Sequence, residues 1–163
     1  MQSQCTKILL IGYGNPGRLD DGLGPAVADI IERKNIGCVT VDSNYQLSVE
    51  DADTISKSDI VLFVDADTCG REPFWIERVD PKKQLSFSSH SISPNALMDM
   101  SNNLLGGKAT GYLMGIRGYE FNEFGERLSK KALQNMNNAI SFLESALEER
   151  NFDKYVELYK KGH

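Results

Sequence analysis

Four side chains in this sequence have the chemistry of a metal-binding or proton-transfer site. Asp20 and Asp21 are adjacent in a glycine-rich loop, Gly12 to Gly24, that follows the first apolar run of the chain. Asp65 comes directly after a later apolar run, and His90 lies in a serine-rich stretch. Two carboxylate oxygens and one imidazole nitrogen suit a borderline divalent cation, and three ligands leave positions open for a substrate. Such a set, without cysteine, fits transient metal binding better than a permanent structural site.

Each of these residues also has an ordinary structural interpretation. Adjacent aspartates complement the dipole at the start of a helix, and Asp65 has the character of a turn residue or helix cap. A histidine in a polar loop is more often a surface residue than a ligand. Position favours the metal site, because Asp21 and Asp65 are both expected beyond the carboxyl ends of strands. If those strands are neighbours, the two carboxylates converge on one rim of the sheet.

The elements that would position these residues alternate along the chain. Continuous apolar runs are typical of buried parallel strands. We expect strands at Lys7–Gly12, Cys38–Asp42, Asp59–Asp65, Phe74–Val79 and Tyr112–Ile116, with Phe74–Val79 at an edge. Amphipathic segments predict helices over Pro25–Lys34, near Ser48, after Ser93-Pro94 and after Ser129. The pattern predicts an α/β three-layer sandwich, in which a mostly parallel, twisted five-stranded sheet with one antiparallel strand is flanked by helices on both faces.

The chain length of 163 residues fits one domain. We expect that domain over residues 1–150, followed by a tail over residues 151–163 that extends the last helix, docks on a partner or frays. The last helix carries its apolar residues on one face: Leu133, Met136, Ile140, Leu143 and Leu147.

Composition excludes several classes of protein. The formal net charge of -5 argues against a nucleic-acid-binding face, which would be basic. No apolar run approaches the roughly 18 residues that span a bilayer, so we expect no membrane partner. The three cysteines, Cys5, Cys38 and Cys69, form no CxxC pair, which argues against a zinc knuckle or a thioredoxin-type site. A reduced, cytoplasmic compartment fits this usage, with Cys38 and Cys69 as small buried hydrophobes near strand ends.

The loop also matches the sequence motif of a dinucleotide-binding site. The segment from Gly12 to Gly17 matches GxGxxG after a strand, and Asp42 closes the second strand near the place of a ribose-binding acid. In that fold, however, the last glycine leads directly into a helix that binds the pyrophosphate. Here Pro16 occupies the turn, more loop follows, and Asp20 and Asp21 would repel phosphate. The loop favours the presentation of carboxylates over the binding of phosphates.

Taken together, several blocks of the sequence resemble the hydrogenase maturation endopeptidases. The blocks are Gly12-Tyr13-Gly14-Asn15, Asp20-Asp21-Gly22-Leu23-Gly24, Val64-Asp65-Ala66, Ser89-His90-Ser91-Ile92-Ser93-Pro94 and, more weakly, Gly115-Ile116-Arg117 with Leu128-Ser129. They occur in the family's order and extend from Lys7 to about Leu147. Each block alone is weak evidence for the resemblance, whereas the whole set in this order is specific for the family.

The resemblance implies an endopeptidase that removes the C-terminal extension of a nickel-iron hydrogenase large-subunit precursor after nickel insertion. The nickel belongs to the substrate and is recognised through two carboxylates and one histidine, which correspond here to Asp21, Asp65 and His90. Asp21 is preferred to Asp20 because it directly precedes the Gly22-Leu23-Gly24 step, and Asp67 is a further acid near Asp65.

The resemblance leaves the chemistry of the cleavage open. The sequence has no Gly-x-Ser-x-Gly elbow and no His-Glu-x-x-His helix. The metal either polarises the scissile carbonyl or acidifies a water, or serves for recognition while a carboxylate activates water. Alternatives to this function are a nucleotide-binding or dinucleotide-binding module, a protease of related fold that acts on another protein, and a degenerate paralogue that only binds the immature subunit.

Overall fold

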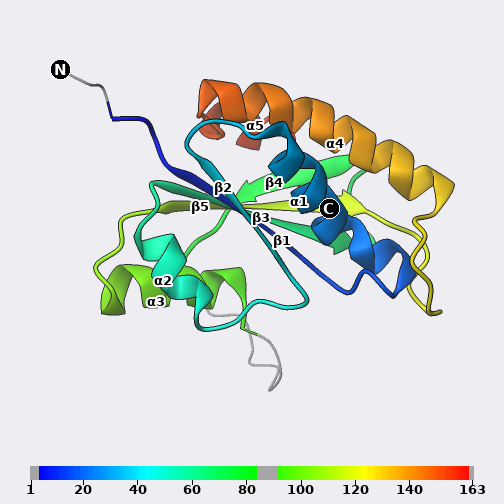
Figure 1. Cartoon of the computed structure of the whole chain (residues 1–163), viewed down its shortest axis with the longest axis horizontal. Coiled ribbons are helices and arrows are strands. Elements are labelled where there is room, and N and C mark those ends of the chain that lie inside the picture. Colours follow the sequence, from blue (N-terminus) through cyan, green and yellow to red (C-terminus); the bar gives the residue numbers. More distant parts are fainter. Residues whose placement is uncertain (1–3, 84–91, 162–163) are drawn as a thin grey trace.

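The computed structural model describes residues 4–83 and 92–161. Its centre is a five-stranded sheet with strand order β2-β1-β3-β5-β4 (Figure 1). The strands are β1 (Ile8–Tyr13), β2 (Val39–Asn44), β3 (Ile60–Asp67), β4 (Phe74–Arg78) and β5 (Thr110–Arg117). The β1, β2, β3 and β5 strands pair in parallel, and β4 pairs antiparallel to β5 at one edge. This arrangement confirms the predicted mixed sheet with one antiparallel strand.

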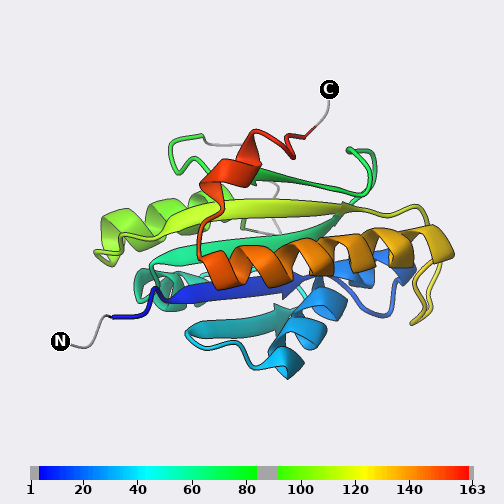
Figure 2. The same ribbon diagram turned by 90° about the horizontal axis from the view of Figure 1, so that it is seen from above.

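Helices cover both faces of the sheet. They are the 3-10 helix η1 (Leu19–Gly22), α1 (Leu23–Lys34), α2 (Asp51–Ser56), α3 (Pro94–Leu104), α4 (Lys130–Glu149) and α5 (Asp153–Val156). The α1 and α4 helices pack on one face, and α2 and α3 pack on the other. Figure 2 shows α4 lying across the middle strands. The predicted three-layer sandwich is therefore confirmed.

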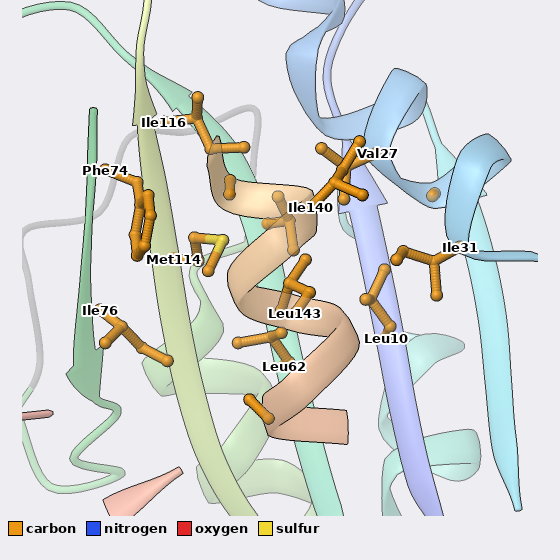
Figure 3. Packing of buried hydrophobic residues seen from close by; sticks show 14 of the residues in the cluster. Leu10, Val27, Ile31, Leu62, Phe74, Ile76, Met114, Ile116, Ile140 and Leu143 are labelled. Atoms are coloured by element: carbon orange, nitrogen blue, oxygen red, sulfur yellow. The ribbon is translucent and has the colours of Figure 1, made fainter. Parts of the chain in front are cut away.

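The larger core lies between the sheet and the α1/α4 layer. Leu10, Leu62 and Met114 point from three neighbouring strands towards Ile140 and Leu143 of α4 (Figure 3). All three strand residues are at most 1% exposed, which explains why their strands read as continuous apolar runs.

One residue of the predicted apolar face of α4 is not buried. Leu133 is 43% exposed, whereas Met136, Ile140, Leu143 and Leu147 are buried as predicted. Ala132, the preceding residue in the same turn, has no exposed surface, so the buried face of α4 begins at Ala132 and not at Leu133.

The chain turns back at the end of α4 instead of continuing it. Arg150 adopts a left-handed conformation, and Phe152 follows with no exposed surface. The main-chain N–H of Ile76 in β4 donates to the carbonyl of Tyr159 at 2.8 Å. Residues of the tail thus cover the edge of β4, which blunts an otherwise open edge strand.

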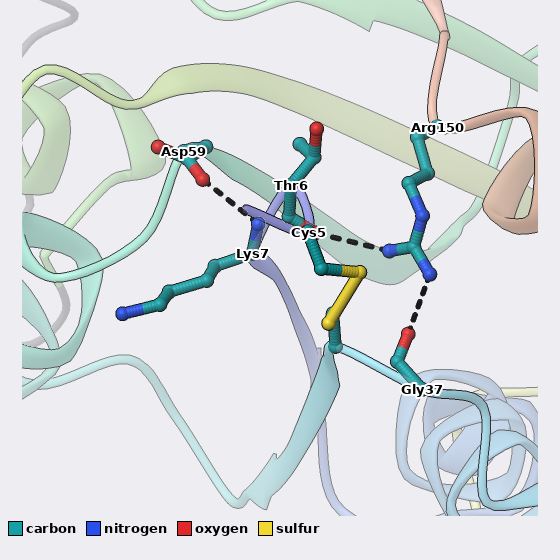
Figure 4. Close-up of a disulfide and its surroundings, with 7 residues drawn as sticks. Cys5, Thr6, Lys7, Gly37, Asp59 and Arg150 are labelled. Atoms are coloured by element: carbon teal, nitrogen blue, oxygen red, sulfur yellow. Dashed lines mark hydrogen bonds between the residues drawn. A yellow bond between two sulfur atoms is a disulfide. The ribbon is translucent and has the colours of Figure 1, made fainter. Parts of the chain in front are cut away.

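The cysteine prediction was wrong in two respects. Cys38 is exposed and forms a disulfide with Cys5 (Figure 4), and Cys69 is an exposed free cysteine. Beside the disulfide, Arg150 donates to the carbonyls of Thr6 and Gly37, which belong to the same two segments. The disulfide and the guanidinium therefore both hold the N-terminal segment next to the start of β2.

Over the described ranges, no helix is both long enough and apolar enough to cross a membrane.

Candidate active site

The sheet has one point where successive connections leave on opposite faces. The β1 strand is followed by α1 on one face, and β2 is followed by α2 on the other, so β1 lies between β2 and β3. In open parallel sheets a crevice forms at such a switch point, outside the carboxyl ends of the strands. Asp21 follows β1, and Asp65 lies near the end of β3. The topology therefore brings the two predicted carboxylates to the same rim of the sheet, at the carboxyl ends of neighbouring strands.

The glycine loop holds Asp21 against the end of β1. A Cβ atom on Gly14, which has a φ of +141°, would lie 2.1 Å from the carbonyl oxygen of Asp21. The N–H of Asn15 donates to the Asp21 carboxylate at 2.9 Å, and the Asn15 side chain accepts from the N–H of Gly17 at 2.8 Å. Glycine is therefore required at position 14 for close approach, and Asn15 orders the loop.

The same loop is not shaped as a dinucleotide cradle. Gly17 does not lead into a helix, because η1 comes between it and α1. At the start of α1, a Cβ atom on Gly24 would lie 2.4 Å from the carbonyl of Tyr13 and 2.6 Å from that of Val64. Strand carbonyls thus pack against the helix N-terminus where a pyrophosphate would have to bind.

Asp20 is buried and fully engaged, in contrast to Asp21. Its side chain has no exposed surface. It accepts from the N–H groups of Tyr119 (2.8 Å), Glu120 (3.0 Å) and Ser129 (2.7 Å), and from the Ser129 hydroxyl (2.7 Å). Burial alone would raise the pKa of Asp20, but these four donors outweigh it and lower the pKa. Asp20 therefore fixes the loop after β5, and Ser129 in turn caps α4.

Asp65 lies in an environment that disfavours its charge. Burial is the largest influence and raises the pKa of Asp65 to about 7. The negative charges of Asp21 and Asp67 act in the same direction. The N–H of Ala66, 2.8 Å from the carboxylate, and the hydroxyl of Tyr13 donate to it and oppose the rise. Asp21 therefore contributes to the raised pKa of Asp65, after burial, through its negative charge.

Asp67 shares the face of β3 with Asp65 but has a different partner. Its Oδ2 accepts from the indole N–H of Trp75 at 2.6 Å. Two carboxylates of β3 are thus distinguished by their donors, a tyrosine hydroxyl for Asp65 and an indole for Asp67.

The third predicted ligand, His90, lies outside the described residues, as does His163. The described chain resumes at Ile92, which packs on the same cluster as Tyr13. Ser93 then caps α3 by accepting from the N–H of Ala96 at 3.1 Å, as predicted. Within residues 4–83 and 92–161, no group of three or more histidine, cysteine, aspartate or glutamate residues could hold a metal ion.

Comparison with known proteins places the fold. Protein-family models and curated proteins give no match. Among solved structures, the NiFe hydrogenase maturation protease HycI from Thermococcus kodakarensis superposes with a TM-score of 0.70 at 23% identity, over 88% of this chain and 93% of that one. The maturating endopeptidase HybD from E. coli gives 0.64 at 17%, over 90% and 94%. A hydrogenase 2 maturation peptidase from a Thaumarchaeota archaeon gives 0.63 at 17%, over 88% and 99%.

The chain has the fold of the hydrogenase maturation proteases. The resemblance noted in the sequence is thereby confirmed for the fold, over nearly the whole length of each chain.

Sequence reasoning missed the contacts of three residues near this rim. Tyr13 appeared only as the variable position of a glycine motif, and Trp75 only as part of an edge strand. The task of Asp20 was also missed, because its partners lie 99 to 109 residues away. A local signal existed only for Tyr13, which is the last residue of the buried strand β1 and therefore lies beside its parallel neighbour.

Proposed function

We propose that this protein is an endopeptidase that removes the C-terminal extension of a nickel-iron hydrogenase large-subunit precursor after nickel insertion. One observation carries the proposal. Asp21 follows β1 and Asp65 lies near the end of the neighbouring parallel strand β3, in a fold shared with hydrogenase maturation proteases. The ordered motif blocks of the sequence support the same function.

In this proposal, the substrate carries the nickel and this protein recognises it. Asp21, Asp65 and His90 are the ligands, with two carboxylates and one imidazole as donors. Asp20 is excluded from this task because all its hydrogen-bonding capacity is used within the fold. Because these three side chains would bind a metal that the substrate carries, recognition of the substrate would depend on prior nickel insertion. A metal bound at this place could also polarise the scissile carbonyl or make a bound water more acidic.

A processing assay tests the proposal. Wild-type protein incubated with a nickel-loaded large-subunit precursor should shorten the subunit at its C-terminus, as seen by intact-mass measurement. Asp21→Asn, Asp65→Asn and His90→Ala should each slow cleavage by about 100-fold or more. Asp29→Asn, which removes an exposed carboxylate of α1 paired with Arg33, is the matched control and should cleave at the wild-type rate. A protein that leaves precursors of every hydrogenase type intact would not have the proposed function.

A further inference from the structure

The Cys5–Cys38 disulfide lies at the amino ends of the strands, at the opposite end of the sheet from the candidate active site. It joins the segment before β1 to the residue directly before β2, and these two strands are parallel neighbours (Figure 4). Both cysteines are exposed. Asp21 and Asp65, by contrast, belong to the carboxyl-end rim. The disulfide is therefore separate from the proposed cleavage chemistry and accessible to a thiol in solution.

The segments that carry the two cysteines are also held by main-chain hydrogen bonds. The N–H of Ile8 donates to the carbonyl of Cys38 at 2.9 Å. The N–H of Lys7 donates to the carboxylate of Asp59 at 2.8 Å, and its carbonyl accepts from the N–H groups of Asp59 and Ile60 at 2.9 and 3.1 Å. None of these contacts involves a sulfur atom. When the S–S bond opens, the chain therefore stays attached to the sheet from Lys7 onwards.

Arg150 forms a second bridge beside the disulfide. Its guanidinium donates to the carbonyl of Thr6 at 3.0 Å through Nη1 and to the carbonyl of Gly37 at 2.7 Å through Nη2 (Figure 4). Thr6 follows Cys5 in the chain, and Gly37 precedes Cys38. Because the guanidinium is a rigid planar fork, one side chain holds the neighbour of each cysteine. The separation of the two main-chain segments is thus constrained from outside the disulfide.

We propose that Cys5 and Cys38 form a reversible thiol–disulfide exchange site for a small thiol, and that Arg150 is a positioning residue for its closure. The thiolate of one small-thiol molecule attacks one sulfur of the disulfide, forms a mixed disulfide and releases the other cysteine, which takes up a proton. A second small-thiol molecule attacks the mixed disulfide, frees the remaining cysteine and leaves as the small-molecule disulfide. The two cysteines gain two electrons and two protons, which the two small thiols lose.

The contribution of Arg150 is to keep the two thiols close after reduction. Its hydrogen bonds use carbonyl groups, which do not change when the S–S bond opens. Two thiols on segments held side by side close the disulfide again within one molecule, at a higher effective concentration than two thiols on loosely held segments. Arginine stays protonated at every pH that a folded protein meets, so it holds the two segments throughout the range in which thiols exchange. This inference goes beyond the proposed function and does not rest on it.

Equilibration of the full chain in glutathione buffers of defined ratio tests the inference. Free thiols are trapped with a maleimide and counted by intact mass, and circular dichroism reports the fold. Cys69 is an exposed free cysteine, so every protein in the series carries Cys69→Ser and reports on the pair alone. The protein with Arg150 should change reversibly between no label and two labels as the buffer becomes more reducing, and it should stay folded at both ends.

Substitution of Arg150 tests the positioning role. Arg150→Gln removes the fork, so it should shift the exchange equilibrium about tenfold towards the two thiols. Arg150→Lys keeps the charge without the planar fork and should shift the equilibrium in the same direction. Arg33→Gln is the matched control, because it removes an exposed arginine of α1 that pairs with Asp29. It should leave the exchange equilibrium unchanged.

Two results would overturn the inference. One is a pair that does not exchange, with the same number of labels in every buffer or with loss of the fold on reduction. The other is an equilibrium in Arg150→Gln equal to that of the protein with Arg150. Both are measured without a hydrogenase precursor, so they are distinct from a failure of wild-type protein to cleave a nickel-loaded precursor, which would contradict the proposed function.

Discussion

At the scale of single residues, two adjacent aspartates have opposite surroundings. Asp20 is saturated by donors from a distant loop, and Asp21 receives one N–H within its own loop. A chain that presents a carboxylate to another protein must also hold the presenting loop still. Asp20 supplies that support, because it ties the loop to the start of α4 through Ser129. We therefore expect stability to depend on Asp20 and cleavage to depend on Asp21.

Asp20→Ala should lower the free energy of unfolding by about 3 kcal/mol or more, because three buried N–H groups lose their acceptor. The folded pKa of Asp20 is lowered, so its contribution is fully present above the pKa of the unfolded chain. It is lost as the pH falls through the folded pKa. Urea denaturation at pH 7 and at pH 3 should thus show a large difference from wild type at pH 7 and a smaller one at pH 3. Asp29→Ala on the surface should change little, and an equally small effect of Asp20→Ala would contradict the assigned role.

Asp65→Asn should have the opposite effect on stability. Its pKa rises to about 7 in the folded chain, so between about pH 4 and pH 7 the folded state holds a proton that the unfolded state has lost. The amount by which Asp65 lowers the free energy of unfolding therefore grows between about pH 4 and pH 7 and is constant above pH 7. The neutral amide should raise the free energy of unfolding by about 2–4 kcal/mol at pH 8 and leave it nearly unchanged at pH 4. Unfolding curves at the two pH values measure this, and no gain at pH 8 would show that burial does not disfavour the carboxylate.

At the scale of elements, the turn from β1 to α1 and the segment after α4 do most to shape the molecule. The turn is compact because its glycines have no side chains, so the main chains of β1, η1 and α1 can contact one another directly. The segment after α4 folds back over β4, where Phe74, Phe142 and Tyr159 form an aromatic cluster. We therefore expect one substitution in the turn and one in the segment after α4 each to destabilise the protein.

Gly14→Ala should disrupt both the fold and the site. The new methyl group would lie 2.1 Å from the carbonyl of Asp21, and φ is +141°. Gly106→Ala is a matched control, because Gly106 also has a positive φ but no atom within 4 Å of its Cβ position. We expect a loss of about 1 kcal/mol for Gly106→Ala and a loss several times larger for Gly14→Ala, read from thermal unfolding. Equal losses of stability in the two variants would mean that the close approach of Gly14 to the Asp21 carbonyl does not constrain the residue at position 14.

Phe152→Ala tests whether the C-terminal segment is part of the domain. Phe152 has no exposed surface, whereas Leu158 is 64% exposed. Removal of the buried ring should cost about 3–5 kcal/mol, and Leu158→Ala should cost less than about 0.5 kcal/mol. Chemical denaturation distinguishes the two. A small effect of Phe152→Ala would mean that the segment is only loosely attached.

The sequence predicts those parts of the molecule that depend on local pattern. Buried parallel strands read as apolar runs, and the carboxyl ends of neighbouring strands share one rim, so the pattern alone predicts that Asp21 and Asp65 lie together there. Contacts between segments distant in the chain leave no such pattern. The donors to Asp20, the reach of Trp75 over Gly115 and the pairing of Cys5 with Cys38 all depend on the folded chain.

At the scale of the whole molecule, strand order decides where the chemistry lies. The β2 and β3 strands flank β1 on opposite sides, so the carboxyl ends of β1 and β3, near Asp21 and Asp65, lie side by side at a switch point of the sheet. The tail closes the β4 edge, and the disulfide with Arg150 fastens the N-terminal segment at the far ends of the strands. The edges of the sheet are therefore fastened, while Asp21 stays partly exposed at the carboxyl-end rim.

The central claim is that this protein reads nickel in an immature hydrogenase subunit. The most direct measurement is cleavage by wild-type protein of one large-subunit precursor prepared in nickel-loaded and nickel-free forms, followed by intact mass in parallel. We predict a shortened subunit from the nickel-loaded form and an unchanged mass from the nickel-free form. Equal cleavage of both forms, or of neither, would contradict the claim.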